Sequence, residues 1–206
     1  MDITIRKAKV EDKPFIAKMI LQSSRHGKKF GLFDLLLEDL EDVERLKFLE
    51  GLCDTKTKYN LKNFLIAELD EKQVGSLCSY EYQQEVDEEF IELFEKVGVH
   101  KDTLLEELHI LQNCDFNLSK KTLMFDCMEE VEDFIDVGVL KALMQKSLLN
   151  ARFRGYRVAK TVVEIGALDT LLFYKKLGFK EIEEKECEAY RERYGRSGFV
   201  LLAIEF

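Results

Sequence analysis

The spacing of hydrophobic residues near the start of the chain predicts one strand followed by helices. Ile3 and Ile5 alternate with polar residues, which is the period of a half-buried strand. Asp12 and Pro14 then mark a helix start, and apolar residues within 15–20 supply one face of that helix. Farther along, four residues recur at helical spacing and predict one further continuous helix: Leu36, Leu40, Val43 and Leu46.

The rest of the chain continues with strands and helices in turn. Two strand-like runs at 64–68 and 74–80 flank the polar turn 70–73, which predicts an antiparallel hairpin. The same patterns then predict, in order, helices 90–97 and 104–111, strand 122–128, helix 138–151, strand 158–165, helix 168–177, and strands 179–183 and 199–206. This order predicts an α/β protein (α+β mixed sheet), with a central mixed β-sheet flanked by helices.

Length and composition narrow the range of functions. We expect a single domain over 1–206, with helical insertions near 23–60 and 85–120, and 46% hydrophobic residues suffice for a sizeable core. A formal net charge of −9 disfavours binding to a nucleic-acid backbone and favours cationic partners such as amines. No apolar run approaches the ~20 residues of a membrane helix, so no membrane partner is expected.

The cysteines predict reduced thiols and a cytoplasmic location, because they are scattered and odd in number: Cys53, Cys78, Cys114, Cys127 and Cys187. No cysteine or histidine has the spacing of a metal site, so no metal is expected. Cys78 and Cys127 lie inside apolar strand-like runs, where small core residues are a better interpretation than catalytic thiols.

One segment carries a resemblance to a known family. Residues 161–179 end in Phe173-Tyr174-Lys-Lys-Leu-Gly178-Phe179 and resemble the last strand-helix-strand unit of the GNAT family of acyl-CoA-dependent N-acetyltransferases. Weaker similarities lie upstream, in Ile5-Arg6-Lys-Ala8 with Glu11-Asp12 and in Phe64-Leu-Ile-Ala-Glu followed by Gln73-Val74-Gly75. The resemblance implies a GNAT-like fold and transfer of an acetyl group from acetyl-CoA to an amine, by direct attack in a ternary complex.

The resemblance also implies a cofactor loop of the pattern Gln/Arg-x-x-Gly-x-Gly/Ala between a strand and a helix. Here that loop falls on Ile135, Asp136, Val137, Gly138, Val139 and Leu140, of which Gly138 alone matches. Backbone N–H groups at a helix N-terminus suit the pyrophosphate of acetyl-CoA, and glycine allows close approach. A lone glycine between strand and helix is also an ordinary turn residue. An asparagine frequent in the family aligns with Ala167.

The remaining implied site residues concern proton transfer. Tyr174 matches a tyrosine that acts in many family members as general acid on the departing thiolate, and the alternative is a phenol packed in the core. Glu129 and Glu130 follow strand 122–128 and are the candidate bases, unless they form a solvated acidic turn. The backbone from Met128 to Glu130 is expected to pair with the pantetheine arm.

Two functions stay open at this stage. The first is an N-acetyltransferase acting on an amine-bearing small molecule or peptide, with acetyl-CoA as acyl donor. The second is a catalytically degenerate GNAT-fold module for binding or protein interaction, which the departures at Ile135 and Leu140 favour. A homodimer is compatible with either function.

Overall fold

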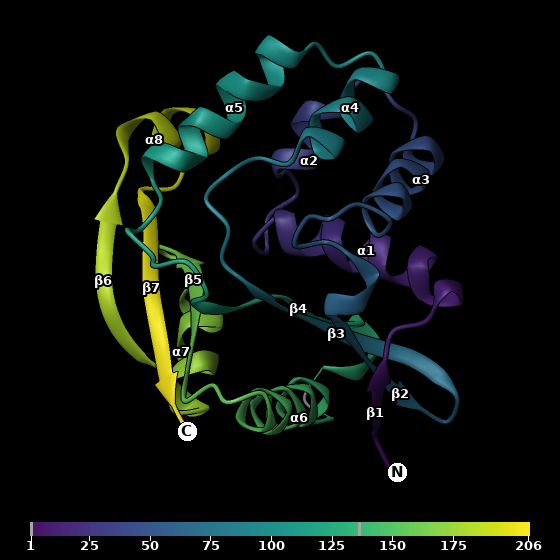
Figure 1. Cartoon of the computed structure of the whole chain (residues 1–206), viewed down its shortest axis with the longest axis vertical. Helices are drawn as coiled ribbons and strands as arrows, with labels where there is room; N and C mark the ends of the chain where they lie inside the picture. Colours follow the sequence, from purple (N-terminus) through teal and green to yellow (C-terminus); the bar gives the residue numbers. More distant parts are fainter. Residues whose placement is uncertain (1, 136) are drawn as a thin grey trace.

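The protein is built on one curved mixed sheet. The computed structural model describes residues 2–135 and 137–206, and in these the strands form a seven-stranded sheet of order β1-β2-β3-β4-β5-β7-β6 (Figure 1). The strands are β1 (Thr4–Lys7), β2 (Phe64–Leu69), β3 (Lys72–Glu81), β4 (Leu123–Glu130), β5 (Val158–Glu164), β6 (Lys180–Glu186) and β7 (Gly198–Glu205). The mixed α/β class predicted from the element order is confirmed.

The helices are α1 (Lys13–Ser24), α2 (Leu32–Leu36), α3 (Asp42–Leu52), α4 (Glu88–Lys96), α5 (Lys101–Asn113), α6 (Val139–Phe153), α7 (Leu168–Lys176) and α8 (Glu188–Tyr194). Helices α2 and α3 lie in the segment 23–60, and α4 and α5 lie in the segment 85–120. That these two segments are insertions stays a prediction. Over the described ranges, no helix is long and apolar enough to cross a membrane.

One helix prediction was wrong. The continuous helix expected through Leu36 and Leu46 is divided, because α2 ends at Leu36 and α3 begins at Asp42. Asp34 in α2 accepts hydrogen bonds from the guanidinium groups of Arg25 and Arg45, which fixes α2 against its neighbours. Val43, the expected third contact of a single apolar stripe, is 79% exposed.

Helix α8 was not predicted from the sequence. Its seven residues are mostly charged, and Tyr190 is the one buried residue within it. The ring of Tyr190 packs on Tyr194 and on Phe199 of β7, with centroid distances of 4.7 and 4.6 Å. Tertiary contacts made by aromatic rings therefore hold a helix that has no apolar stripe of its own.

Side chains alternate across the sheet, so each face carries a hydrophobic core. In β2, Leu65 and Ala67 join one core, whereas Phe64 and Ile66 join the other. Helices α6 and α7 cover the first core, and α1 to α5 cover the second. Figure 1 shows α6 on one side of β3 and β4, and α1 to α5 on the opposite side. The strands in the middle of the sheet are therefore buried on both faces.

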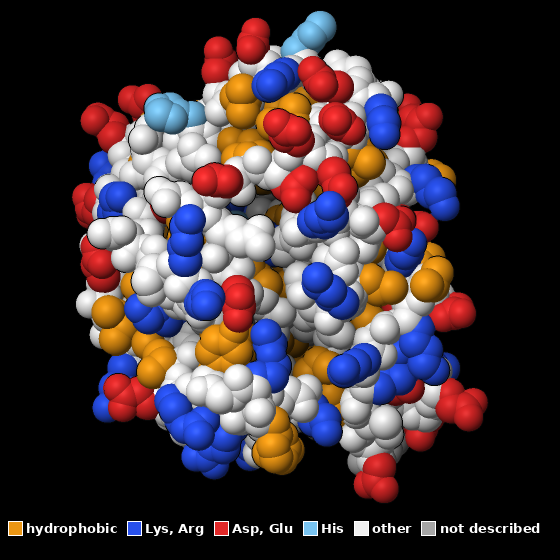
Figure 2. All heavy atoms as spheres, in the orientation of Figure 1, with side chains coloured by type: hydrophobic (Ala, Val, Ile, Leu, Met, Phe, Trp, Pro, Cys, Tyr) orange, Lys and Arg blue, Asp and Glu red, His pale blue; other side chains and the backbone are white. Residues whose placement is uncertain are grey.

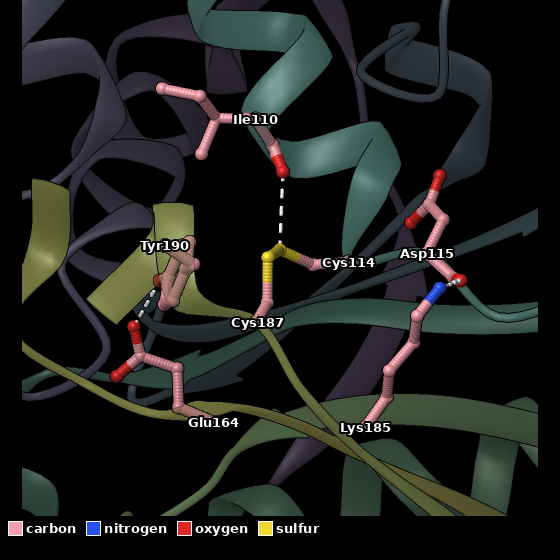
Figure 3. Close-up of a disulfide and its surroundings, with 7 residues drawn as sticks. All are labelled: Ile110, Cys114, Asp115, Glu164, Lys185, Cys187 and Tyr190. Carbon is pink, nitrogen blue, oxygen red and sulfur yellow. Dashed lines mark hydrogen bonds between the residues drawn. A yellow bond between two sulfur atoms is a disulfide. The ribbon is translucent and has the colours of Figure 1, made fainter. Parts of the chain in front are cut away.

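A disulfide joins Cys114 to Cys187, contrary to the expectation that all five cysteines are reduced. Cys114 follows the last residue of α5 and Cys187 precedes α8, and the fold brings their Cα atoms to 5.6 Å (Figure 3). Sequence spacing could not reveal this pair, because the two residues are 73 positions apart. The cytoplasmic location inferred from reduced thiols stays a prediction. The interpretation of Cys78 and Cys127 as core residues is confirmed by their burial.

Candidate active site

Two neighbouring strands separate at the centre of the sheet. β4 and β5 are the parallel pair among the strands of the described chain, and their ladder registers Met124 opposite Lys160 alone. The hydroxyl of Thr161 on β5 donates to the carbonyl of Phe125 at 2.9 Å, which ties the strands together where the separation begins. Beyond this tie β4 still pairs with β3 as far as Glu130. Ligands of α/β proteins bind at the carboxyl ends of such parallel strands, where the sheet opens.

A β-bulge at Cys127 changes which side chains reach each face. Cys127 has a φ of +47°, and the register between β3 and β4 shifts at this point. Consequently Asp126 and Cys127 both line a cavity on the α1 side of the sheet, whereas Met128 packs with the core under α6 and α7. Glu129 then returns to the α1 side. Without the extra residue, strict alternation from Phe125 would turn Glu129 towards α6.

Glu129 has the ionisation behaviour of a general base that works near neutral pH. Burial raises the pKa of its carboxyl to about 7, although hydrogen bonds from Gln22 and Ser23 of α1 act in the opposite direction. The Gln22 amide lies 2.6 Å from Glu129 Oε2 and also donates to the carbonyl of Glu130 at 3.2 Å. Both acids belong to β4 and are half-buried, so neither lies in a solvated turn as one interpretation of the sequence supposed.

Tyr174 lies on the other face of the same opening. The phenol is buried in the core under α7, and its ring meets Phe179 edge to face at 5.1 Å. Burial raises the pKa of Tyr174, and the hydroxyl of Thr161 lies within hydrogen-bonding reach of the phenol. Tyr174 is therefore protonated at neutral pH and lies beside the tie between β4 and β5. This position is compatible both with a proton donor and with a packed core residue.

The predicted cofactor loop leads into the N-terminus of α6. Gly138 caps the helix with a φ of +95°, and a side-chain carbon built there would meet nothing within 4 Å. Glycine is therefore needed for the left-handed backbone, and space does not require it. The side chain of Val139 is buried in the core and that of Leu140 packs against it, so only backbone groups of these residues are available to a ligand. The first N–H groups of any helix lack intrahelical acceptors.

The other predicted loop residues have different surroundings. Ile135 and Val137 expose 54% and 43% of their surface, respectively. Ala167 caps the start of α7, so two helix N-termini follow the two separating strands. Asp136 lies outside the described residues.

Two adjoining cavities lie on the α1 side of the opening. The inner cavity, of about 130 Å³, is lined by Ser23, Asp126 and Cys127 together with Glu164 and Tyr190. The outer cavity, of about 510 Å³, shares several lining residues with the inner one: Leu32, Lys58, Tyr59 and Leu111. Figure 2, in the orientation of Figure 1, shows a hollow near the middle of the molecule, with both basic and acidic side chains around it.

Ion pairs surround the inner cavity. Lys58 Nζ lies 2.5 Å from Asp126 Oδ2, and Glu164 is paired with Arg196 at 2.9 Å and with Lys28 at 3.4 Å. The Tyr190 hydroxyl also donates to Glu164, next to the disulfide (Figure 3). Burial opposes ionisation of Asp126, but Lys58 and the Cys127 N–H outweigh it, so the pKa of Asp126 is lowered.

Lys58, Asp126 and Glu164 were not predicted from the sequence. For the two acids a signal was present, since each interrupts or ends an apolar strand: Phe125-Asp126-Cys127 and Val163-Glu164-Ile165. A charged residue in such a run needs a partner in the folded state. For Lys58 no local pattern was available, because its segment 53–63 is ordered by contacts with β3 and β4.

Comparison with known proteins identifies the fold. An N-acetyltransferase from Staphylococcus aureus Mu50 matches with a TM-score of 0.67 at 18% identity, over 98% of this chain and 100% of its own. Drosophila melanogaster polyamine N-acetyltransferase, an enzyme that catalyses the formation of N-acetylagmatine, matches with a TM-score of 0.63 at 12% identity over 100% of both chains. The PaiA N-acetyltransferase from Thermoplasma acidophilum, solved with coenzyme A, matches with a TM-score of 0.54 at 12% identity, also over 100% of both chains.

No protein-family model and no curated protein sequence matches the chain. The similarity to solved structures nevertheless extends over almost every residue and includes a GNAT-family acetyltransferase from Streptococcus pneumoniae. The fold is that of the GNAT N-acetyltransferases, as the resemblance of residues 161–179 predicted.

Proposed function

We propose that this protein is an acyl-CoA-dependent N-acetyltransferase that moves an acetyl group from acetyl-CoA to an amine within a ternary complex. The observation that carries the proposal is the opening between β4 and β5. On one side it faces two helix N-termini, and on the other it adjoins the inner cavity, with a carboxyl group of raised pKa nearby. A donor and an acceptor could therefore meet from opposite faces of the sheet.

On the α6 side, backbone groups suit coenzyme A better than the side chains do. The first turn of α6 offers N–H donors and the positive end of a helix dipole to a pyrophosphate. The backbone from Met128 to Glu130 runs along the opening, where the pantetheine arm would lie. Ile135 stands where the family pattern has Gln or Arg, so one charged or polar donor is lost. Bound acetyl-CoA supplies the activated acyl group as a thioester.

The protein's own contribution is orientation and proton transfer. Ionised Glu129 accepts a proton from the acceptor ammonium, directly or through the Ser23 hydroxyl and water. The neutral amine attacks the acetyl carbon, and a C–N bond forms as the C–S bond breaks. Tyr174 donates its proton to the departing sulfur and later recovers one from solvent. In total the acceptor ammonium loses two protons: the first passes to Glu129 before attack, and the second passes to water as the tetrahedral intermediate collapses to the amide. The thiolate gains the proton of Tyr174, so one proton is released to solvent overall, and no oxidant or reductant is required.

A second function is favoured by one specific observation, the poor match of the loop at 135–140. In that case the opening and the cavities would serve a GNAT-fold module that binds a ligand or another protein without catalysis. The two functions make different predictions for acetyl-CoA binding, because only the enzyme needs it.

Calorimetric titration with acetyl-CoA, followed by assay of a panel of amines for CoA release, tests the proposal. We expect binding weaker than that of a protein with the full loop pattern, since a lost charge-assisted hydrogen bond costs ~1.5–3 kcal/mol. Absence of both heat and thermal stabilisation at millimolar acetyl-CoA would support the non-catalytic module instead. Binding without turnover on any amine would support a degenerate enzyme that retains its donor site.

A further inference from the structure

We propose, on the basis of the proposed function, that Lys58 selects the acceptor: the substrate is an amine that carries a carboxylate at its far end, and it is not a polyamine. The inference concerns the inner cavity on the α1 side and the charges that line it. It rests on the place of Lys58 between the two cavities, on its unused hydrogen-bond donors, and on the pairing of every carboxylate that faces the inner cavity.

Lys58 lies where the inner and outer cavities meet. Its side chain lines both of them, and 35% of that side chain is accessible although it lies deep in the protein. A molecule that entered through the outer cavity towards Cys127 would therefore pass this ammonium. At this position a charged group can discriminate between substrates by the charge that they carry at the end remote from the reacting amine.

The ammonium has hydrogen-bonding capacity to spare. Of its three N–H donors, one is used by Asp126, and among the described residues no second acceptor is bonded to it. The rings of Tyr59 and Tyr80 lie 5.1 and 5.7 Å from Nζ, and their faces favour a cation without using N–H donors. Burial disfavours the charge of Lys58, but Asp126 outweighs it and the pKa is raised, so the group is cationic at every physiological pH.

The backbone that carries Lys58 is held in place before any ligand binds. Its carbonyl accepts hydrogen bonds from Asn63 Nδ2 at 2.9 Å and from the Cys78 thiol at 3.2 Å. The amide of Asn60 closes the same segment on the carbonyl of Thr55. A cation on a preorganised segment loses little entropy when it binds an anion.

The charge balance of the inner cavity favours one anionic group. Lys28, Lys58 and Arg196 face Asp126 and Glu164, which leaves one positive charge in this set of ion pairs. His26 also lines the inner cavity, and burial lowers its pKa, so it adds no charge at neutral pH. A single carboxylate would complete the balance. The second ammonium of a polyamine would instead meet Asp126 and Glu164, which already have cationic partners, although Glu164 Oε2 accepts no hydrogen bond among the described residues.

The distance along β4 suggests how the acceptor lies. Asp126, which holds Lys58, and Glu129, the proposed base, are three residues apart, or ~10 Å on an extended strand and less across a bulge. That span exceeds the separation of the α-amine and carboxylate within one amino acid. It suits a terminal amine with its carboxylate several carbon atoms away, as in lysine or 5-aminopentanoate.

The test compares acceptors that differ only in their far end. Initial rates of CoA release are measured with 5-aminopentanoate, cadaverine and pentylamine, which share five carbon atoms and end in a carboxylate, an ammonium and a methyl group, and with lysine as a larger carboxylate. We expect the two carboxylates to have a kcat/KM ~10-fold or more above that of cadaverine, the usual effect of one charge-assisted hydrogen bond. Lys58→Met should lower kcat/KM for 5-aminopentanoate ~10- to 100-fold, mainly through KM, and change pentylamine little.

Matched variants separate recognition from folding. Lys58→Met with Asp126→Asn removes both charges, so no carboxylate is left buried without a partner, and it should show the same loss of discrimination. Lys58→Arg should retain the preference. Lys13→Met removes a lysine whose ion pair with Asp54 has the same 2.5 Å length but lies away from the cavities, and it should leave the preference intact.

The outcomes distinguish this inference from the proposed function. If acetyl-CoA does not bind, both fail. If acetyl-CoA binds and cadaverine is acetylated as fast as or faster than the carboxylates, the acceptor inference alone is overturned. If no acceptor is turned over, calorimetry of 5-aminopentanoate and cadaverine with CoA present decides: heat only with the carboxylate, lost in Lys58→Met, supports the inference, and any other pattern overturns it.

Discussion

The side-chain amide of Gln22 donates a 2.6 Å hydrogen bond to Glu129, which links α1 to the end of β4. Because the bulge at Cys127 turns Glu129 to this face, the half-buried carboxyl is both oriented by α1 and partly shielded from bulk water. Orientation fixes the direction in which the carboxylate can accept a proton. This partial burial raises its pKa to about 7, close to the optimum for a base that acts at neutral pH.

We predict that Glu129→Gln lowers kcat/KM by ~10²-fold or more, the usual contribution of general base catalysis. In the wild type, protonation below the pKa of about 7 abolishes the base, so kcat/KM should rise as the pH increases through that value. The variant should lose this limb and keep the rise at higher pH that reflects the amine itself. Acetyl-CoA affinity, measured by calorimetry, should stay close to that of the wild type.

Glu130→Gln is the comparison, because Glu130 is the other candidate base on β4. A greater loss of rate in Glu130→Gln than in Glu129→Gln would transfer the role to Glu130. A pH profile unchanged in both variants would show that water, or another group, removes the proton.

A second prediction concerns Tyr174→Phe, which removes one oxygen and keeps the buried ring. If Tyr174 protonates the thiolate, kcat should fall ~10²-fold while acetyl-CoA affinity changes far less. If Tyr174 only packs in the core, unfolding should become easier by about 1 kcal/mol and turnover per folded molecule should persist. Tyr156→Phe is the control, since it removes a hydroxyl bonded to Glu81 on an exposed part of the chain.

The sequence predicted the strands better than helices α2, α3 and α8, for a physical reason. Strands such as β2 and β3 are apolar runs closed by a polar turn, and their local pattern is sufficient to identify them. The division between α2 and α3 depends instead on the ion cluster of Asp34 with Arg25 and Arg45, residues of three separate segments. Local spacing contains no information about such contacts.

The candidate site divides in the same way. Tyr174 and Glu129 were predicted as site residues because they belong to segments that resemble a known family or follow a predicted strand. The bulge at Cys127, which decides that Asp126 and Glu129 face α1, left no trace in the apolar run 122–128. Lys58 reaches Asp126 from 68 positions away, a relation that only the folded chain reveals.

A third prediction tests the α6 side of the opening. Gly138→Val is a poor probe, because a φ of +95° would strain valine whether or not a ligand binds nearby. Val137→Glu is preferable: Val137 is 43% exposed, and a negative charge beside the first turn of α6 would compete with a pyrophosphate. We expect the Kd for acetyl-CoA to rise ~3- to 10-fold, with a smaller effect at high salt.

Leu149→Glu is the matched control for Val137→Glu. Leu149 lies within α6 and is 46% exposed, but it is about three turns from the helix start that Val137 precedes. Equal affinities of the two variants for acetyl-CoA would contradict a pyrophosphate site at the start of α6.

The last prediction concerns the disulfide, which ties α5 to α8. Both helices supply walls of the cavities, through Leu111 and Tyr190, whereas the α6 side of the opening contains neither helix. Replacing Cys114 and Cys187 by Ser should lower the free energy of unfolding by about 4 kcal/mol, because the crosslink closes a loop of 73 residues in the unfolded chain. The same variant should raise the acceptor KM while the acetyl-CoA Kd stays unchanged, since only the acceptor side loses its restraint. Urea denaturation with and without reductant measures the first effect, and steady-state kinetics with calorimetry measure the second.

Thiol titration of the denatured, unreduced wild type supplies the control: three reactive thiols are expected from Cys53, Cys78 and Cys127. If all five cysteines react, the bond is absent under those conditions, and reductant should then leave stability and KM unaltered.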